Sequence, residues 1–142
     1  MIAGGVIAID TSAIVAMIRR EPEWAAFASV LATANEIYIS AVSVLEASMV
    51  LVGGQGGESE RSSLDTLLDR LKIEIIPFDA AQARLAQDAF MIYGKGRGDE
   101  RRGRSAGLNF GDCASYALAK ARSVPLLFKG DDFAHTDVTP AV

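Results

Sequence analysis

Short apolar segments alternate with segments of helical spacing along this chain, and the alternation restricts the folds that it can adopt. Strands that are separated by helices form mostly parallel sheets, because each return to the sheet needs a crossover connection. The pattern predicts a three-layer α/β/α fold, with helices on both faces of a mostly parallel central sheet of four to five strands. The expected strands are 6–9, 37–39, 73–76 and 125–128.

The segments between these strands carry apolar residues three and four positions apart, the spacing of a helix that packs against a core. Trp24 belongs to such a stripe, which favours core packing over a role as a base-stacking platform. Asp79 is placed to cap the helix that ends near Tyr93, and Asp112 lies in the first turn of the last helix. The other expected helices are 13–20, 23–34, 40–52 and 58–71.

Length and composition limit the classes of function. The 142 residues predict a single domain over 1–142, and a formal net charge of −4 argues against a strongly basic nucleic-acid binder. One cysteine and one histidine exclude a Cys/His zinc site and argue against a histidine-dependent triad. No apolar run reaches the roughly 18 residues of a membrane span, and no signal peptide is apparent. We expect a cytoplasmic protein without membrane association.

Acidic residues stand where this fold places strand ends and helix starts. Asp10 ends the first strand, Glu46 follows the second strand, and Asp112 begins a helix, while the pair 131–132 follows the last strand. Each has a structural explanation on its own, as a helix cap, a charge that favours the helix dipole, or a turn. In a parallel sheet, however, strand ends and the starts of the following helices share one edge. We therefore expect these acids to face one crevice.

Electrostatics indicate what such a cluster is for. Two carboxylates about 5 Å apart repel by roughly 3 kcal/mol at an effective dielectric of about 20. The repulsion among four of them would be comparable to the free energy of unfolding of a whole domain, which is about 5–15 kcal/mol. The cluster therefore needs protons or divalent cations. Oxygen ligands without histidine or cysteine favour Mg²⁺ or Mn²⁺, and such ions suit phosphodiester chemistry.

The segments 6–13, 40–47, 108–113 and 125–133 each contain or lead into one of these acids. In their order and spacing they resemble the motifs of the PIN-domain ribonucleases, and most closely those of the VapC toxins of bacterial toxin–antitoxin pairs. The resemblance implies a Mg²⁺-dependent endoribonuclease, with Mn²⁺ as the alternative ion, that cuts RNA and inhibits translation. It also implies a VapB-type antitoxin partner and a homodimer. The four motifs span nearly the whole chain.

The resemblance assigns roles by position. Asp10, Glu46 and Asp112 match the acidic residues that bind metal and catalyse cleavage in this family. Asp132 fits the fourth acidic position best, because an aromatic residue follows it, and Asp131 is its rival.

The resemblance also assigns supporting residues and shows one departure. Thr11 and Ser12 match the polar positions beside the first acid, where Ser12 is placed to orient that carboxylate. Residues 99–105 look inserted relative to the family, within a glycine-rich loop that carries five basic residues against two acids. The loop is either a solvated surface insertion or an arm that contacts an RNA backbone. The candidate RNA-binding residues are Lys95, Arg97, Arg101, Arg102 and Arg104.

Other classes fit the residues less well. A phosphorelay receiver has the same α/β order and a lysine after the last strand, where this chain has Lys129. A receiver also needs a phospho-accepting acid after a middle strand, and this chain has none there. A haloacid-dehalogenase-type phosphatase needs an aspartate where Ser12 stands. A non-catalytic PIN-like scaffold that binds RNA or protein is the remaining alternative, and it gives no reason for the chain to tolerate the repulsion among the acids.

Overall fold

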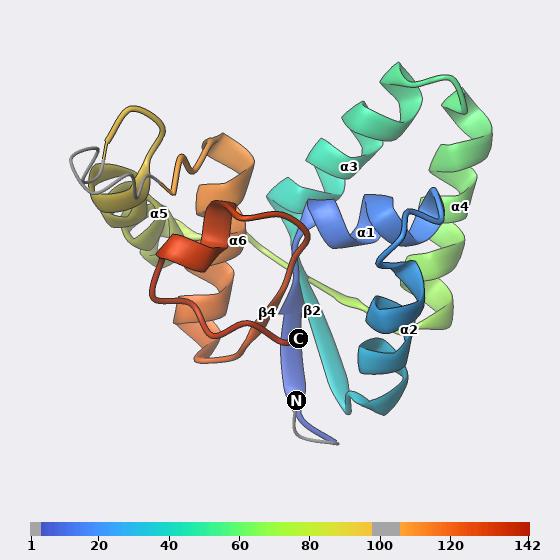
Figure 1. Ribbon diagram of the computed structural model, residues 1–142, viewed down its shortest axis with the longest axis horizontal. Coiled ribbons are helices and arrows are strands. Elements are labelled where there is room, and N and C mark those ends of the chain that lie inside the picture. The colour runs from blue at the N-terminus through green and yellow to red at the C-terminus, as the bar shows by residue number, and fades with distance from the viewer. Residues whose placement is uncertain (1–3, 98–105) are drawn as a thin grey trace.

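A four-stranded sheet, parallel throughout, forms the centre of the computed structural model, which describes residues 4–97 and 106–142. The strand order is β3-β2-β1-β4. The described part of the chain thus confirms the three-layer α/β/α prediction, with four strands (Figure 1). The strands are β1 (Val6–Ile9), β2 (Glu36–Ser40), β3 (Glu74–Ile76) and β4 (Leu126–Leu127).

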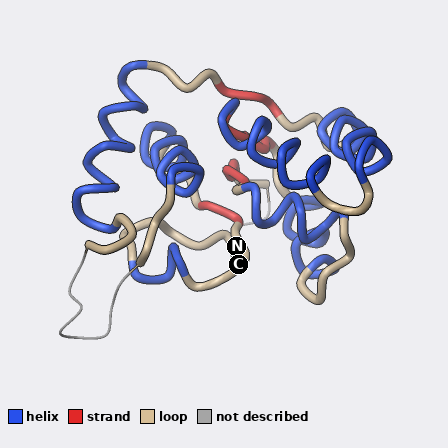
Figure 2. Tube along the Cα trace, turned by 90° about the horizontal axis from the view of Figure 1, so that it is seen from above, coloured by secondary structure: helices blue, strands red, loops and turns tan. Residues whose placement is uncertain are grey.

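Helices cover both faces of the sheet, and Figure 2 shows the layers from above. One layer contains α1 (Thr11–Ile18), α2 (Trp24–Thr33), α3 (Ala41–Gly53) and α4 (Gly57–Arg70). The other contains α5 (Ala80–Tyr93) and α6 (Phe110–Arg122). A short 3₁₀ helix, η2 (Asp132–His135), follows β4.

The two-residue period of β1 divides the core between the layers. Ile7 and Ile9 pack with the α1–α4 layer, whereas Ala8 packs with the α6 side. All three are at most 1% exposed, so the central strand is buried on both faces. A continuous apolar run is the sequence signature of such a strand, and an acid at its end is therefore delivered to the edge of the sheet.

One local expectation needs correction. The last strand is expected over 125–128 but comprises only Leu126 and Leu127, which pair with Ala8 and Ile9 of β1, while Leu126 also bridges to Pro140. The apolar stripe of α4 packs against the core: Leu64 and Leu68 are buried, and Leu67 and Leu71 are partly buried against it. Leu67 also borders a groove that is described below.

The strand order creates a switch point beside β1. The chain moves outward from β1 through β2 to β3, then returns past α5 and α6 to place β4 on the other side of β1. Crevices at such points, at the carboxyl ends of the strands, are where open α/β sheets bind ligands. Asp10 follows β1 directly, so the topology places it at this crevice.

The C-terminal segment is tied to α6 by one carboxylate. Tyr116 Oη donates to Asp137 Oδ1 at 2.6 Å, and Lys120 Nζ lies 2.8 Å from Asp137 Oδ2. Burial acts to raise the pKa of Asp137, but the contacts with Lys120 and Tyr116 outweigh it and lower that pKa.

Among the helices of residues 4–97 and 106–142, none combines the length and hydropathy that crossing a membrane requires.

Candidate active site

One cavity at the carboxyl edge of the sheet collects the acids that the sequence singles out. Its volume is about 400 Å³, and Asp10, Glu46, Asp112 and Asp132 all line it. Thr11 and Ser12 also line it, whereas Asp131 does not. The structure therefore brings together four acids from four separate elements, and it places Asp132 rather than Asp131 on the cavity wall.

Asp10 is the most buried of these acids, with only 2% of its surface exposed. It is the N-cap of α1, because its Oδ2 accepts from the amide of Ser12 at 3.0 Å. The same oxygen accepts from Ser12 Oγ at 2.7 Å, and Asp10 Oδ1 accepts from Ser115 Oγ. The side chain is thus both a helix cap and a wall of the cavity, so capping α1 does not exclude a role for this carboxylate in the cavity.

Glu46 projects from the second turn of α3. Ser40 caps this helix, since its Oγ accepts from the Val42 amide at 3.2 Å, and Ser43 makes no cap. The Glu46 carboxylate lies directly over the Cα of Gly111 in α6, where any Cβ would overlap it. Glycine at 111 therefore makes the room that lets Glu46 reach across to the first turn of α6.

Asp112 closes a capping box at the start of α6. Its amide donates to Asn109 Oδ1 at 2.9 Å, and the Asn109 amide donates back to Asp112 Oδ2 at 3.0 Å. The arrangement satisfies two helix-end donors. It also fixes the Asp112 carboxylate at the cavity, where the Asn109 side chain is a further lining group.

The cavity is electrostatically strained. Burial is the main cause that raises the pKa of Asp112 to about 7, and the charges of Asp10, Asp132 and Glu46 add to the rise against the opposing Asn109 hydrogen bond. Burial likewise raises the pKa of Glu46; the Thr11 hydroxyl opposes that rise and the charge of Asp10 adds to it.

Protein cations do not relieve this strain within the described part of the chain. No ion pair between described residues involves any of the four acids. Lys129 lines the cavity, but its Nζ pairs with Glu21 and Glu23, at 3.2 Å each. The acids therefore share a cavity with uncompensated negative charge.

The chemistry of this donor set fits a hard divalent cation. The candidate ligands are carboxylate oxygens, and the cavity lining also includes the hydroxyls of Thr11 and Ser12. As the side chains are placed, no three acidic, histidine or cysteine groups among the described residues yet form a metal cage. A cation in this cavity would offset the repulsion among the acids.

The candidate RNA-binding residues are only partly described. Lys95 is exposed just after α5, and the Arg97 guanidinium lies 5.7 Å from the centre of the Phe90 ring. The predictions for Arg101, Arg102 and Arg104, and for the whole inserted segment 99–105, fall outside the described residues.

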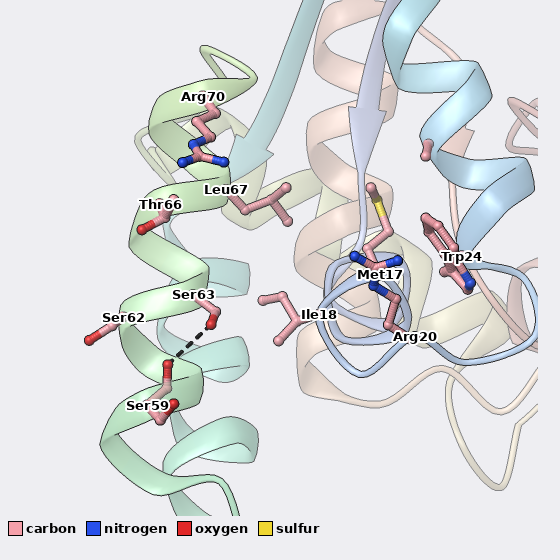
Figure 3. A pocket seen from close by; sticks show the side chains of 11 residues that line it. Met17, Ile18, Arg20, Trp24, Ser59, Ser62, Ser63, Thr66, Leu67 and Arg70 are labelled. Atoms are coloured by element: carbon pink, nitrogen blue, oxygen red, sulfur yellow. Dashed lines mark hydrogen bonds between the residues drawn. The ribbon is translucent and has the colours of Figure 1, made fainter.

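A second cavity lies between α1, α2 and α4, away from the acids, with a volume of about 560 Å³. Figure 3 shows Ile18 of α1 and Leu67 of α4 pointing into the space between the two helices. Arg20 stacks over the half-buried Trp24, 4.1 Å from the ring centre, and Arg70 stands on α4. The expectation that Trp24 is a core residue is therefore wrong: it lines a groove whose α1 and α2 side is largely apolar, whose α4 side carries serine and threonine hydroxyls, and which has two arginines at its borders.

Replacing Asp112 by Asn should stabilise the protein in the absence of metal. The raised pKa means that folding favours the protonated carboxyl, so its stabilising contribution is present below about pH 4 and is lost as the pH rises toward 7. Asn keeps an acceptor for the Asn109 amide but carries no charge. Urea unfolding in EDTA above pH 7 should show a gain of about 1–2 kcal/mol, a figure reduced for solvent screening of this partly exposed group.

Two controls accompany this measurement. Asp112→Ala also removes the capping acceptor and should gain less than Asn, while Asp65→Asn on the exposed face of α4 should leave the unfolding free energy unchanged. A loss of stability in Asp112→Asn above pH 7 would show that the carboxylate acts only as a cap.

Comparisons with known proteins agree with this geometry. The PIN domain family matches residues 7–138. Ribonuclease VapC28 of Mycobacterium tuberculosis is 45% identical over 134 residues, which are 94% of this chain and 96% of the relative. Ribonuclease VapC of Mycolicibacterium smegmatis is 42% identical over 130 residues, which are 92% of this chain and 95% of the relative.

Solved structures show the same fold at low sequence identity. The crystal structure of Mycobacterium tuberculosis VapC20, a toxin that cleaves the sarcin–ricin loop, superposes with a TM-score of 0.73 at 15% identity, over 94% of this chain and 96% of that one. VapBC2 from Rickettsia felis, bound to a fragment of promoter DNA, gives a TM-score of 0.65 at 19% identity, over 95% and 96% of the two chains. By its family match and its relatives, the chain belongs to the PIN-domain family and, within it, to the VapC ribonucleases.

Proposed function

We propose that this protein, acting as one PIN-like unit over 1–142, is a metal-dependent endoribonuclease that cuts RNA phosphodiester bonds. The observation that carries the proposal is the single cavity lined by Asp10, Glu46, Asp112 and Asp132, none of which forms an ion pair with a described cation. The VapC ribonucleases that are 40–45% identical to it over nearly their whole length support the same activity.

The chain's own groups would prepare the site for the reaction. Asp10, Glu46, Asp112 and Asp132 would hold Mg²⁺ or Mn²⁺. Such an ion stabilises charge on a phosphoryl oxygen and activates water for attack. The Asn109–Asp112 capping box fixes one carboxylate at the start of α6. Exposed Lys95, together with Arg97 and the arginines at 101, 102 and 104, is placed along the chain to contact the RNA backbone.

Purified protein should cleave single-stranded or loop RNA in Mg²⁺ or Mn²⁺, and EDTA should abolish cleavage. Asp10→Asn and Asp132→Asn should each lower kcat at least a hundredfold, because each removes a charge that holds the ion. The assay follows labelled RNA on a denaturing gel. Asp131→Asn is the matched control, since this neighbouring acid does not line the cavity and its loss should leave kcat within about twofold.

Cleavage that persists in EDTA, or in Asp10→Asn, would overturn the proposal. Binding of RNA without any cleavage in either metal would favour the non-catalytic scaffold instead. Equal losses in Asp131→Asn and Asp132→Asn would contradict the placement of the fourth acid.

The protein is further proposed to be the toxin of a VapBC-type pair, one that inhibits translation and is held inactive by a VapB-type antitoxin. Chains from solved structures of VapBC toxin–antitoxin systems have the same fold as this protein. The groove between α1, α2 and α4 suits an antitoxin segment with apolar side chains and at least one acid. Ile18 and Leu67 offer the apolar surface, and Arg20 and Arg70 offer positive charge at its borders.

Arg70→Glu should weaken binding of the antitoxin encoded by the neighbouring gene at least tenfold, because it replaces an attractive charge at the groove by a repulsive one. Biolayer interferometry on the full chain measures the dissociation constant. Arg61→Glu makes the same charge change on the same helix outside the groove and should have little effect. Equal weakening in both variants, or none in Arg70→Glu, would place the antitoxin elsewhere.

A homodimer is the second proposed assembly. Apolar side chains are exposed along α3, with Leu45 and Met49 at 63% and 67%, and Phe110 at the start of α6 is 81% exposed. Phe110 borders both the α3 face and the α5 face, which makes the surface continuous. Patches of this kind mark protein–protein contacts, and a second copy of the chain is the proposed occupant.

Met49→Asp should convert the dimer to a monomer, because a charge would be buried in an apolar contact. Light scattering after size-exclusion chromatography measures the mass. Val142→Asp places the same change on an exposed apolar residue outside this surface and should leave the mass unchanged. A wild-type monomer, or a Met49→Asp dimer, would contradict this interface.

A further inference from the structure

The Asp10 carboxylate is held by hydroxyl groups on both of its oxygens. On one side, the Lys129 amide donates to Ser12 Oγ at 3.0 Å, and Ser12 Oγ donates to Asp10 Oδ2 at 2.7 Å. On the other side, Ser115 Oγ donates to Asp10 Oδ1, and Ser115 Oγ lies 3.1 Å from Ser43 Oγ. Neither Ser43 nor Ser115 lines the cavity, so both lie behind the acid.

The direction of the second chain follows from proton count. A serine hydroxyl has one proton, and Ser115 gives it to the carboxylate. The contact between Ser43 and Ser115 therefore requires Ser43 to be the donor. The result is a polarised chain from Ser43 through Ser115 to Asp10, and each donated bond strengthens the next one.

These groups are buried and come from different elements of the fold. Ser43 of α3 is 0% exposed, Ser115 of α6 is 1% exposed, and Asp10 before α1 is 2% exposed. Thr11 Oγ1 donates to the Ser43 carbonyl at 3.2 Å, which ties α1 to α3 at the same place. In surroundings this dry, a missing hydrogen bond is costly, so the contacts fix the plane of the carboxylate.

We infer that Ser115, supported by Ser43, is a positioning residue that fixes the Asp10 carboxylate for cation binding and RNA cleavage. The inference rests on the proposed function, because that function assigns Asp10 to the cation. Ser115 touches neither the cavity nor a reacting atom, and its effect passes through Asp10. A ligand of a metal is generally oriented by such a partner, whose loss lowers metal affinity or activity about 10–100-fold.

The experiment measures Mn²⁺ affinity of the full chain by isothermal titration calorimetry, for Ser115→Ala, Ser43→Ala and the double variant. Ser115→Ala should bind Mn²⁺ about 10–100-fold more weakly, and Ser43→Ala should show a smaller loss. The double variant should match Ser115→Ala, because Ser43 acts only through Ser115. In RNA cleavage, kcat should fall while KM stays unchanged.

Ser48→Ala is the matched control. Ser48 lies on α3 like Ser43, but its hydroxyl donates to the Val44 carbonyl at 2.9 Å and has no part in the chain of hydroxyls. Its Mn²⁺ affinity should equal that of the wild type. Circular dichroism melts of all variants separate a change in the site from a loss of folding.

The outcomes distinguish this inference from the proposed function. Wild-type Mn²⁺ affinity in Ser115→Ala would overturn the positioning role, and so would a further loss from Ser43→Ala in the Ser115→Ala background. A wild-type protein that binds Mn²⁺ but cuts no RNA would overturn the proposed function, while the calorimetric comparison would still decide the role of Ser115.

Discussion

Repulsion among carboxylates gathered at one edge of a parallel sheet is the constraint on which the rest of this structure depends. The strand order places Asp10 at a switch point, and the starts of α3 and α6 bring Glu46 and Asp112 to it. Burial and neighbouring charges then raise the pKa of Asp112 to about 7. A cation in the shared space would offset this repulsion, and that is the physical ground for the metal-dependent chemistry that we propose.

Two of the repelling acids also stabilise the fold, because they cap helices. Asp10 caps α1 and Asp112 closes the capping box of α6, so each carboxylate satisfies helix-end amides that would otherwise lack partners. Because Gly111 has no Cβ, the Glu46 carboxylate has room to lie over α6. The capping role and the proposed role in cation binding thus rest on the same atoms, and a neutral amide that preserves the cap is the substitution that separates the two.

Much of this was predictable from local sequence. The apolar run 6–9, the acid that ends it and the alternation with helices predicted the layers and the shared edge of the acids. The features that the sequence did not predict depend on contacts between residues that are distant in sequence. Trp24 has core spacing, but α4 leaves a groove beside it. Ser115 is unremarkable in sequence and meets Asp10 only because α6 packs against β1; its position three residues after Asp112, one helical turn on, was the one available signal.

The most direct test of the account is a crystal structure of the protein with Mn²⁺, with the ion located by its anomalous scattering. We predict a peak between the carboxylates of Asp10, Glu46 and Asp112, with Glu46 and Asp112 turned toward Asp10 and the hydroxyls of Ser12 and Ser115 still bound to it. An acidic cavity without a peak at saturating Mn²⁺, or a peak bound only elsewhere on the surface, would contradict the account.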